Sequence, residues 1–420
     1  MSAAHQRPRS HRRRRALGAV ALAVVTPLLV AYGASAAPWT PNADLDVPAV
    51  DTAPRVADDP GGSLVPIDAP GVGDLGGAAG LVPSQVPTDV VPFEEPAAEA
   101  TTPTTSGAEL RGVRQIDPQT VDIMIDSPAM GREVPVRLLL PRDYAALPDR
   151  KFPALYLLPG YGDPADYKAW FEYTDVEQFF ADKDVIVALP SAGDAGFFSD
   201  WWNYGAGGTP GWETFHTVEL REVLESDWRA NDRRAVAGLS MGGFGAISYA
   251  ARNPGLFDAA ASYSGYLHTT MPGVDRFAQY TIAERGLDPY ALWGDPVLQA
   301  GIWAAHDPFI QAENLRGTEL FISSAVGMRG KYDEGDLVDR VLGALEADDP
   351  RAHVRQTVLA SGLETIAYVT TQSFRQRLAT LGIPVTSHFQ QEGTHSWGYW
   401  QDELKRSWPV LAEGMGVPVQ

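Results

Sequence analysis

Residues 234–251 read RAVAGLSMGGFGAISYAA, and this stretch decides the fold. The apolar run Arg234–Leu239 predicts a strand, and the small residues of Gly243–Ala251 predict a helix. Ser240 stands between them in a G-x-S-x-G pattern, which is typical of a sharp strand-to-helix turn that presents a serine nucleophile. We therefore predict that the Ser240 hydroxyl projects above a sheet, at the N-terminus of a helix.

The two glycines of this pattern have a steric reason. Gly238 and Gly242 flank the turn where side chains would collide with neighbouring elements. A helix N-terminus presents free backbone N–H groups, so the amide of Met241 can point at an oxyanion that develops beside Ser240.

Outward from this turn, short β-rich runs alternate with helical patterns across residues 108–420. Helices are expected at about 212–228 and 362–381, where apolar residues recur at helical spacing. The expected strands are Val121–Ile125, Val134–Leu140, Ala154–Leu158, Val185–Leu189, Ala235–Leu239, Ala259–Tyr263, Glu319–Ser323 and Val385–Phe389. This alternation predicts an α/β fold with a mostly parallel, eight-stranded sheet and helices on both faces.

A serine hydroxyl is a poor nucleophile at neutral pH and needs a base. In a sheet with a G-x-S-x-G turn, the order along the chain is serine, acid, histidine. His395 follows the last expected strand in a loop and is the expected base. His388 lies inside that strand and is expected to be a packed or surface histidine.

The acid that orients the histidine has two groups of candidates. Asp333, Asp336 and Asp339 follow the seventh expected strand closely. Glu364 lies at the start of a predicted helix, where with Ser361 it also fits a capping box, in which the glutamate only caps its own helix. The residue pattern by itself slightly favours the aspartates.

A second oxyanion donor is expected from the loop after the third strand. This loop runs from Leu157 to Gly162, and its glycines let the backbone approach the site. Because Pro159 has no N–H, the backbone amide of Tyr161 is the expected donor.

Residues 108–420 resemble the antigen 85-type mycolyltransferases, within the wider serine esterase family. The matching segments, in chain order, are Ala154–Leu158, Phe198–Trp201, Trp212–Phe215, Gly238–Met241 and Gly393–Trp397. The resemblance implies an α/β-hydrolase fold without cofactor or metal.

The same resemblance implies roles for individual residues. Ser240 corresponds to the nucleophile, His395 to the base, and the amides of Tyr161 and Met241 to the oxyanion donors. The family's acid is a glutamate on a helix about thirty residues before the histidine, and Glu364 lies 31 residues before His395. This moves the expectation for the acid from the aspartates to Glu364.

One departure from the family concerns the acyl acceptor. The family's loop after the third strand usually reads Leu-Asp-Gly-Leu-Arg, and its Asp and Arg bind trehalose. Here Pro159 and Gly162 stand at those places. The acyl-transfer residues are therefore expected to be intact, while the acceptor site is altered.

The N-terminal residues 1–36 predict a secretory signal. Arginines 7, 9 and 12–15 precede an apolar run at 16–31, and Ala34-Ser35-Ala36 has the form of a cleavage site. The alternative is an uncleaved anchor, although sixteen apolar residues are few for a membrane span. We expect a secreted or envelope-associated protein.

Residues 37–107 predict a disordered linker, and 108–420 a catalytic domain. The linker holds 12 prolines and 11 acidic residues but one basic residue, Arg55. Such a segment cannot bury enough apolar surface to become ordered, so we expect a tether that could hold the domain at the cell envelope.

Composition excludes several classes of protein. The whole chain has 33 Lys and Arg against 53 Asp and Glu, a net charge of −20, which argues against binding nucleic acid. With no cysteine, the chain has no disulfide, thiol nucleophile or thiolate-bound metal.

Three functions remain open at this point. The first is an exported acyltransferase that forms an acyl-serine from long-chain, mycolic-type lipid or glycolipid esters. The second is a secreted carboxylesterase with water as acceptor, and the third a non-catalytic binding protein on the same scaffold. Trp201, Trp202 and Trp397 are candidates for an acyl groove, with core packing as the equal alternative, and Trp397 is the expected substrate-binding residue.

Overall fold

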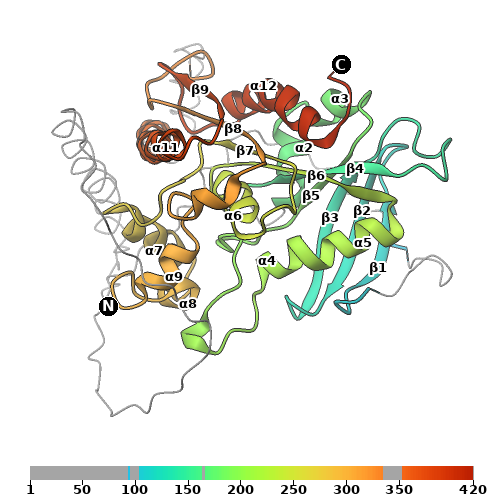
Figure 1. Cartoon of the computed structure of the whole chain (residues 1–420), viewed down its shortest axis with the longest axis horizontal. Helices are drawn as coiled ribbons and strands as arrows, with labels where there is room; N and C mark the ends of the chain where they lie inside the picture. Colours follow the sequence, from blue (N-terminus) through green and yellow to red (C-terminus); the bar gives the residue numbers. More distant parts are fainter. Residues whose placement is uncertain (1–92, 95–103, 163–165, 334–351, 420) are drawn as a thin grey trace, which may run out of the picture. The chain divides into compact units, whose positions relative to one another are not determined.

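The computed structural model describes residues 93–94, 104–162, 166–333 and 352–419, with the backbone alone at 352–358 (Figure 1). All of these belong to one compact unit, Leu75–Gln420. The expected signal at 1–36 and most of the expected linker lie outside the described residues.

One sheet organises this unit, and its strands lie in the order β1-β2-β3-β5-β4-β6-β7-β8-β9. Their bounds are β1 Glu109–Gln115, β2 Thr120–Ser127, β3 Arg132–Leu139, β4 Phe152–Leu158, β5 Ile186–Pro190, β6 Ala230–Leu239, β7 Ala259–Tyr263, β8 Glu319–Ala325 and β9 Thr386–Gln390. The pairs from β5 through β4 to β9 are parallel, whereas β1, β2, β3 and β5 pair antiparallel. The α/β fold is confirmed, and each of the eight predicted runs overlaps a strand.

The prediction of eight strands is wrong by one, because β1 adds a ninth. Its sequence, ELRGVRQ, alternates between exposed charged or polar residues and covered ones, with a register shift between Leu110 and Gly112. An edge strand of this kind has no continuous apolar run, and only its pairing with β2 reveals it.

Two short segments of the expected linker pack on the domain. Glu94 and Val113 exchange two backbone hydrogen bonds of 2.9 Å, and the Arg114 guanidinium lies 4.3 Å from the Phe93 ring centroid. The Ser106 amide donates to Glu222 at 2.8 Å. These segments therefore belong with the folded domain rather than with a free tether.

Helices cover both faces of the sheet, as expected (Figure 1). The helices of one face are α2 Ala169–Tyr173, α3 Val176–Phe180 and α12 Trp397–Met415; those of the other include α5 Leu220–Asp227, α6 Met241–Arg252 and α11 Ala352–Leu381. Along β6, Ala235, Ala237 and Leu239 point to the α12 side and Val236 to the α6 side, which is the two-residue period of a doubly covered strand.

The remaining helical segments lie between strands. Before β6 come η2 Asp166–Lys168, η3 Asn203–Gly205, α4 Trp212–Thr214 and the π-helical η4 Phe215–Glu219. Between β7 and β8 come α7 Val274–Glu284, α8 Pro289–Trp293, α9 Ala300–Ala305 and η5 Gln311–Leu315.

Both expected helices exist, with different bounds. The helix expected at 212–228 consists of α4, η4 and α5 in succession. The helix expected from 362 begins ten residues earlier, at Ala352, so Ser361 is not its cap. Among the helices of the described residues, none combines the length and the apolar sequence that a bilayer span requires.

Candidate active site

Ser240 occupies a strained turn between β6 and α6. Its φ of 52° and ψ of −120° are rare for a residue with a side chain. The Ser240 amide donates to the Tyr263 carbonyl of β7 at 2.8 Å, and the Ser240 carbonyl accepts from the Phe244 amide of α6 at 3.0 Å. Hydrogen bonds on both sides thus hold the turn in its strained conformation.

Close backbone approach explains both glycines of the turn. A Cβ on Gly242 would lie 2.3 Å from the Pro159 carbonyl oxygen, and one on Gly238 would lie 2.4 Å from the Gly242 carbonyl oxygen. Both distances are far below van der Waals contact, so α6 can begin this close to β4 only without side chains there.

The structure brings Ser240, His395 and Glu364 together in one hydrogen-bonded chain. Nε2 of His395 lies 2.7 Å from Oγ of Ser240, and Nδ1 of His395 lies 2.8 Å from Oε2 of Glu364. They come from the turn between β6 and α6, the loop after β9, and α11, which are adjacent only in the folded protein. All three side chains are almost completely covered.

Glu364 does not cap its own helix, as the contacts of its other carboxylate oxygen, Oε1, show. Oε1 accepts from the Ala325 amide at 2.7 Å and from the hydroxyls of Ser264 and Ser324 at 2.9 Å each. Three donors from the carboxyl ends of β7 and β8 therefore fix this carboxylate, and its other oxygen is left to face His395.

The aspartate candidates lie elsewhere. Asp333 accepts from the Thr394 hydroxyl and, at 2.7 Å, from the Tyr399 hydroxyl. It thus braces the loop that carries His395 without bonding to the imidazole. Asp336 and Asp339 lie outside the described residues.

Met241 and the residue before Tyr161 adjoin the serine. Met241 is the first residue of α6, directly after Ser240. Gly160, which precedes Tyr161, packs on the turn: a Cβ on it would lie 2.7 Å from Leu239 Cδ1 and 3.7 Å from Ser240 Cβ. The backbone of the loop after β4 therefore lies against the serine.

Two aromatic residues near the histidine were missed by the sequence analysis. The Trp400 ring centroid lies 4.9 Å from that of His395 at 87°, and Trp400 Nε1 donates to Ser264 Oγ at 3.1 Å. The Tyr266 ring lies 6.1 Å from His395, and its hydroxyl interacts with the Ser240 side chain. Burial raises the pKa of Tyr266. Its place just after β7, at the strand ends that line the site, is the one signal that could have indicated it.

The tryptophans expected near an acyl chain occupy different surroundings. Trp201 belongs to the buried core on the α6 side. Trp202 lies 5.8 Å from the Tyr204 ring, and Tyr204 is exposed. Trp397 is partly buried and packs on Trp170, Tyr173 and Trp400, with ring centroids 5.0 to 5.5 Å apart.

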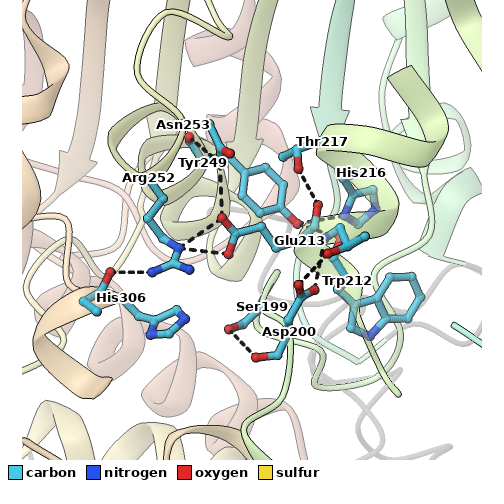
Figure 2. Close-up of polar contacts among 12 residues, drawn as sticks. Ser199, Asp200, Trp212, Glu213, His216, Thr217, Tyr249, Arg252, Asn253 and His306 are labelled. Carbon is cyan, nitrogen blue, oxygen red and sulfur yellow. Dashed lines mark hydrogen bonds and ion pairs between the residues drawn. The ribbon is translucent and has the colours of Figure 1, made fainter. Parts of the chain in front are cut away.

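A separate polar network underlies the matching segment Trp212–Phe215 (Figure 2). Figure 2 shows Glu213 facing Arg252, whose Nε donates to both carboxylate oxygens at 2.8 and 3.0 Å. His216 lies between the Tyr249 hydroxyl and the Ser191 carbonyl, each at 2.8 Å, and burial lowers its pKa to about 4. This network joins α4, η4 and α6 and includes none of the three residues of the Ser240 chain.

Other histidines also have structural partners. His388 pairs with Glu403 at 2.8 Å, in agreement with the expectation for it, and His306 is held by the Ile302 carbonyl at 2.8 Å. Within the described ranges, no group of three or more His, Asp or Glu side chains is placed to hold a metal ion.

The chain is similar to mycobacterial acyltransferases and esterases. It is 29% identical to the diacylglycerol acyltransferase/mycolyltransferase Ag85B of Mycolicibacterium smegmatis over 304 residues, which cover 70% of this chain and 85% of that protein. It is 30% identical to Esterase Rv1288 of Mycobacterium tuberculosis over 65% of this chain, but the match spans only 55% of that esterase.

Solved structures share the fold. The crystal structure of Mycobacterium tuberculosis MPT51 superposes with a TM-score of 0.55 and 24% identity, covering 70% of this chain and 97% of MPT51. An S-formylglutathione hydrolase from Agrobacterium tumefaciens superposes with a TM-score of 0.52 and 14% identity, covering 73% of this chain and 99% of the hydrolase.

The sequence model of the Esterase family matches residues 127–410, which span all the strands from β3 to β9 and the Ser240, His395 and Glu364 chain. Since this match covers well over half of the sequence, and the resemblance to antigen 85-type proteins agrees with it, the chain belongs to the Esterase family.

Proposed function

We propose that the protein transfers acyl groups through a covalent acyl-serine on Ser240. The observation that carries this proposal is the hydrogen-bonded chain from Ser240 through His395 to Glu364, with distances of 2.7 and 2.8 Å. A hydroxyl within hydrogen-bond reach of an imidazole, which is in turn oriented by a carboxylate, is the arrangement that activates serine.

In the first half-reaction, His395 Nε2 takes the proton of Ser240 as Oγ attacks the ester carbonyl. The carbonyl oxygen becomes an oxyanion, which the amides of Tyr161 and Met241 stabilise; one such donor contributes about 2.7–4 kcal/mol. The tetrahedral intermediate then collapses, the bond from carbon to the alcohol oxygen breaks, and His395 returns the proton to the leaving alcohol.

In the second half-reaction, His395 takes a proton from an incoming alcohol or water. That oxygen attacks the acyl-serine carbonyl, and the second intermediate releases Ser240, which regains its proton from His395. Glu364 accepts from Nδ1–H throughout, which keeps Nε2 free to take a proton and stabilises the imidazolium that forms.

For the substrate, we propose long-chain, mycolic-type esters of the cell envelope. Support comes from the matched segments of the antigen 85-type family and from relatives whose names include mycolyltransferase. Pro159 and Gly162 lack the family's polar side chains, so an acceptor other than trehalose is part of the proposal. A carboxylesterase that uses water is the second candidate, favoured by the same two residues.

Export and a substrate contact by Trp397 complete the proposal. The arginine-rich, apolar N-terminus supports export, and the acidic, proline-rich stretch after it supports tethering at the envelope. Trp397 lies two residues after His395 and is only partly buried, so part of its ring can meet an acyl chain.

The test incubates the mature protein with a long-chain acyl ester, alone and with increasing trehalose, glycerol or other sugar alcohols. An acylated alcohol as product supports the transferase, and free acid at every acceptor concentration supports the esterase. Ser240→Ala should abolish labelling by a fluorophosphonate; persistent labelling of this variant would show that another residue is the nucleophile. A folded wild-type protein that neither labels nor turns over any ester would support the binding-protein alternative.

A further inference from the structure

Tyr161 ties the loop after β4 to helix α7. Its hydroxyl accepts a hydrogen bond from Arg285 Nε at 2.9 Å, and the guanidinium lies 4.6 Å from the ring centroid. The same hydroxyl lies 3.2 Å from the Thr281 carbonyl and 3.3 Å from Glu284 Oε2, either of which can accept its single proton. The last turn of α7 therefore holds the Tyr161 hydroxyl, and Arg285, the residue after α7, contacts both the hydroxyl and the face of the ring.

The backbone of the loop is tied to the same residue. Nη2 of Arg285 donates to the Gly162 carbonyl at 3.3 Å. A Cβ on Gly162 would lie 2.4 Å from that nitrogen, and the φ of +94° at this position favours glycine. The glycine that stands in place of the family's side chain is thus what gives the guanidinium room to reach the loop.

This loop also lies against the nucleophile. Gly160 packs on Leu239 and Ser240 so closely that a Cβ would be 2.7 Å from Leu239 Cδ1. Tyr161 is the next residue, so its backbone amide and its clamped side chain share one Cα. The α7 contact and the amide are therefore connected through a single residue.

Helix α7 also packs on a second residue near the serine. Phe277 of α7 packs on Tyr266, with ring centroids 5.2 Å apart, and the Tyr266 hydroxyl interacts with Ser240. The helix thus contacts Tyr266 as well as Tyr161.

We propose that Arg285 is a positioning residue, which clamps Tyr161 and Gly162 so that the Tyr161 amide points at the oxyanion. The inference rests on the acyl transfer proposed above. Arg285 acts through Tyr161 and does not need to touch the substrate. A transition state depends on donors placed within a fraction of an ångström, so loosening this clamp lowers the rate of chemistry more than it weakens binding.

The test compares Tyr161→Phe, Arg285→Met and the double variant on a p-nitrophenyl butyrate substrate. Removing an oxyanion donor costs about 10²–10³ in kcat, so a displaced donor should cost about tenfold, with KM changed less than about twofold. Because both changes break one clamp, the double variant should be no slower than the slower single variant. Arg285→Lys should recover part of the rate, since an ammonium can still donate to the hydroxyl.

Tyr290→Phe is the matched control, because it removes one hydroxyl from a half-exposed tyrosine on α8 and should leave kcat unchanged. Unchanged kcat in both single variants overturns the clamp, and so does a double variant whose loss is the product of the two single losses. A lowered melting temperature with unchanged kcat gives the contact a purely structural role and also overturns it. Failure of acyl transfer itself is recognised separately, because Ser240→Ala would then keep its turnover or its fluorophosphonate label.

Discussion

Glu364→Gln offers the sharpest test of the proposed mechanism, because the structure determines which way the new amide must point. Three donors converge on Oε1: the Ala325 amide and the hydroxyls of Ser264 and Ser324. The hydroxyls can rotate, but the Ala325 N–H cannot. A glutamine NH₂ at this position would leave that buried amide unsatisfied, at about 1–3 kcal/mol. The carbonyl oxygen of the glutamine is therefore expected to occupy the Oε1 position in most molecules.

This orientation aims the amide NH₂ at His395 Nδ1. A donor there requires Nδ1 to accept, so the imidazole proton moves to Nε2, and Nε2 can no longer take the Ser240 proton. The minority with the flipped amide keep the right tautomer but lack the negative charge that stabilises imidazolium. Together these effects predict a loss of about 10⁴ in kcat, or about 5.5 kcal/mol in the barrier.

The assay is turnover of a p-nitrophenyl ester, with thermal unfolding measured in parallel. The volume and three of the contacts of Glu364 are retained, so the free energy of unfolding should fall by only about 1 kcal/mol. Glu403→Gln is the control, since Glu403 is equally buried and pairs with His388 at the same 2.8 Å but is not bonded to the Ser240 chain. If Glu364→Gln keeps a tenth of the wild-type kcat, or Glu403→Gln loses as much activity, the assignment of the acid is wrong.

Four further predictions concern stability and the site. Burial lowers the pKa of His216 to about 4, so the unfolded chain binds this proton first as the pH falls below 6.5. The free energy of unfolding, measured by urea titration, should therefore fall by about 3 kcal/mol between pH 6.5 and pH 4. The effect of Asp166 on the free energy of unfolding has the opposite sign, because burial raises its pKa to about 6 and the folded chain therefore binds this proton first. Asp166→Asn should increase the loss of unfolding free energy over the same pH range by about 2 kcal/mol, and an equal loss in the variant and the wild type would contradict this. Gly242→Ala forces a Cβ to 2.3 Å from the Pro159 carbonyl oxygen and should cost about 3 kcal/mol or prevent folding, so an unchanged melting temperature would refute the close approach. Tyr266→Phe removes the hydroxyl beside Ser240 and should lower kcat about tenfold at constant KM, whereas a change confined to KM would assign Tyr266 to substrate binding.

The sequence by itself determined the elements whose pattern is local. The G-x-S-x-G turn lies where strand and helix patterns meet, and β6 and α6 follow from it. Central strands such as β4, which is buried along its whole length, appear as continuous apolar runs because both of their faces are covered. The edge strand β1 has no such run, since half of its side chains face water, and only its partner β2 defines it.

No local residue pattern decided between the acids, and only the tertiary structure gives the physical reason for Glu364. From the residue pattern, Glu364 fits a cap on its own helix, and the aspartates follow β8 more closely in sequence. The choice depends on where α11 places its side chains relative to the ends of β7 and β8, and no local pattern encodes that distance. The resemblance to a known family supplied the assignment to Glu364, and the hydrogen bonds explain it.

For Arg285 the sequence offers no signal, and for Tyr266 only its place just after a predicted strand. Each is an ordinary residue in a segment without a motif, and each contacts a partner from another segment of the chain: Ser240 for Tyr266, and Tyr161 for Arg285. A local pattern records which backbone conformation a segment prefers. Which side chains meet at the carboxyl ends of the strands is set by the packing of the whole sheet and its helices.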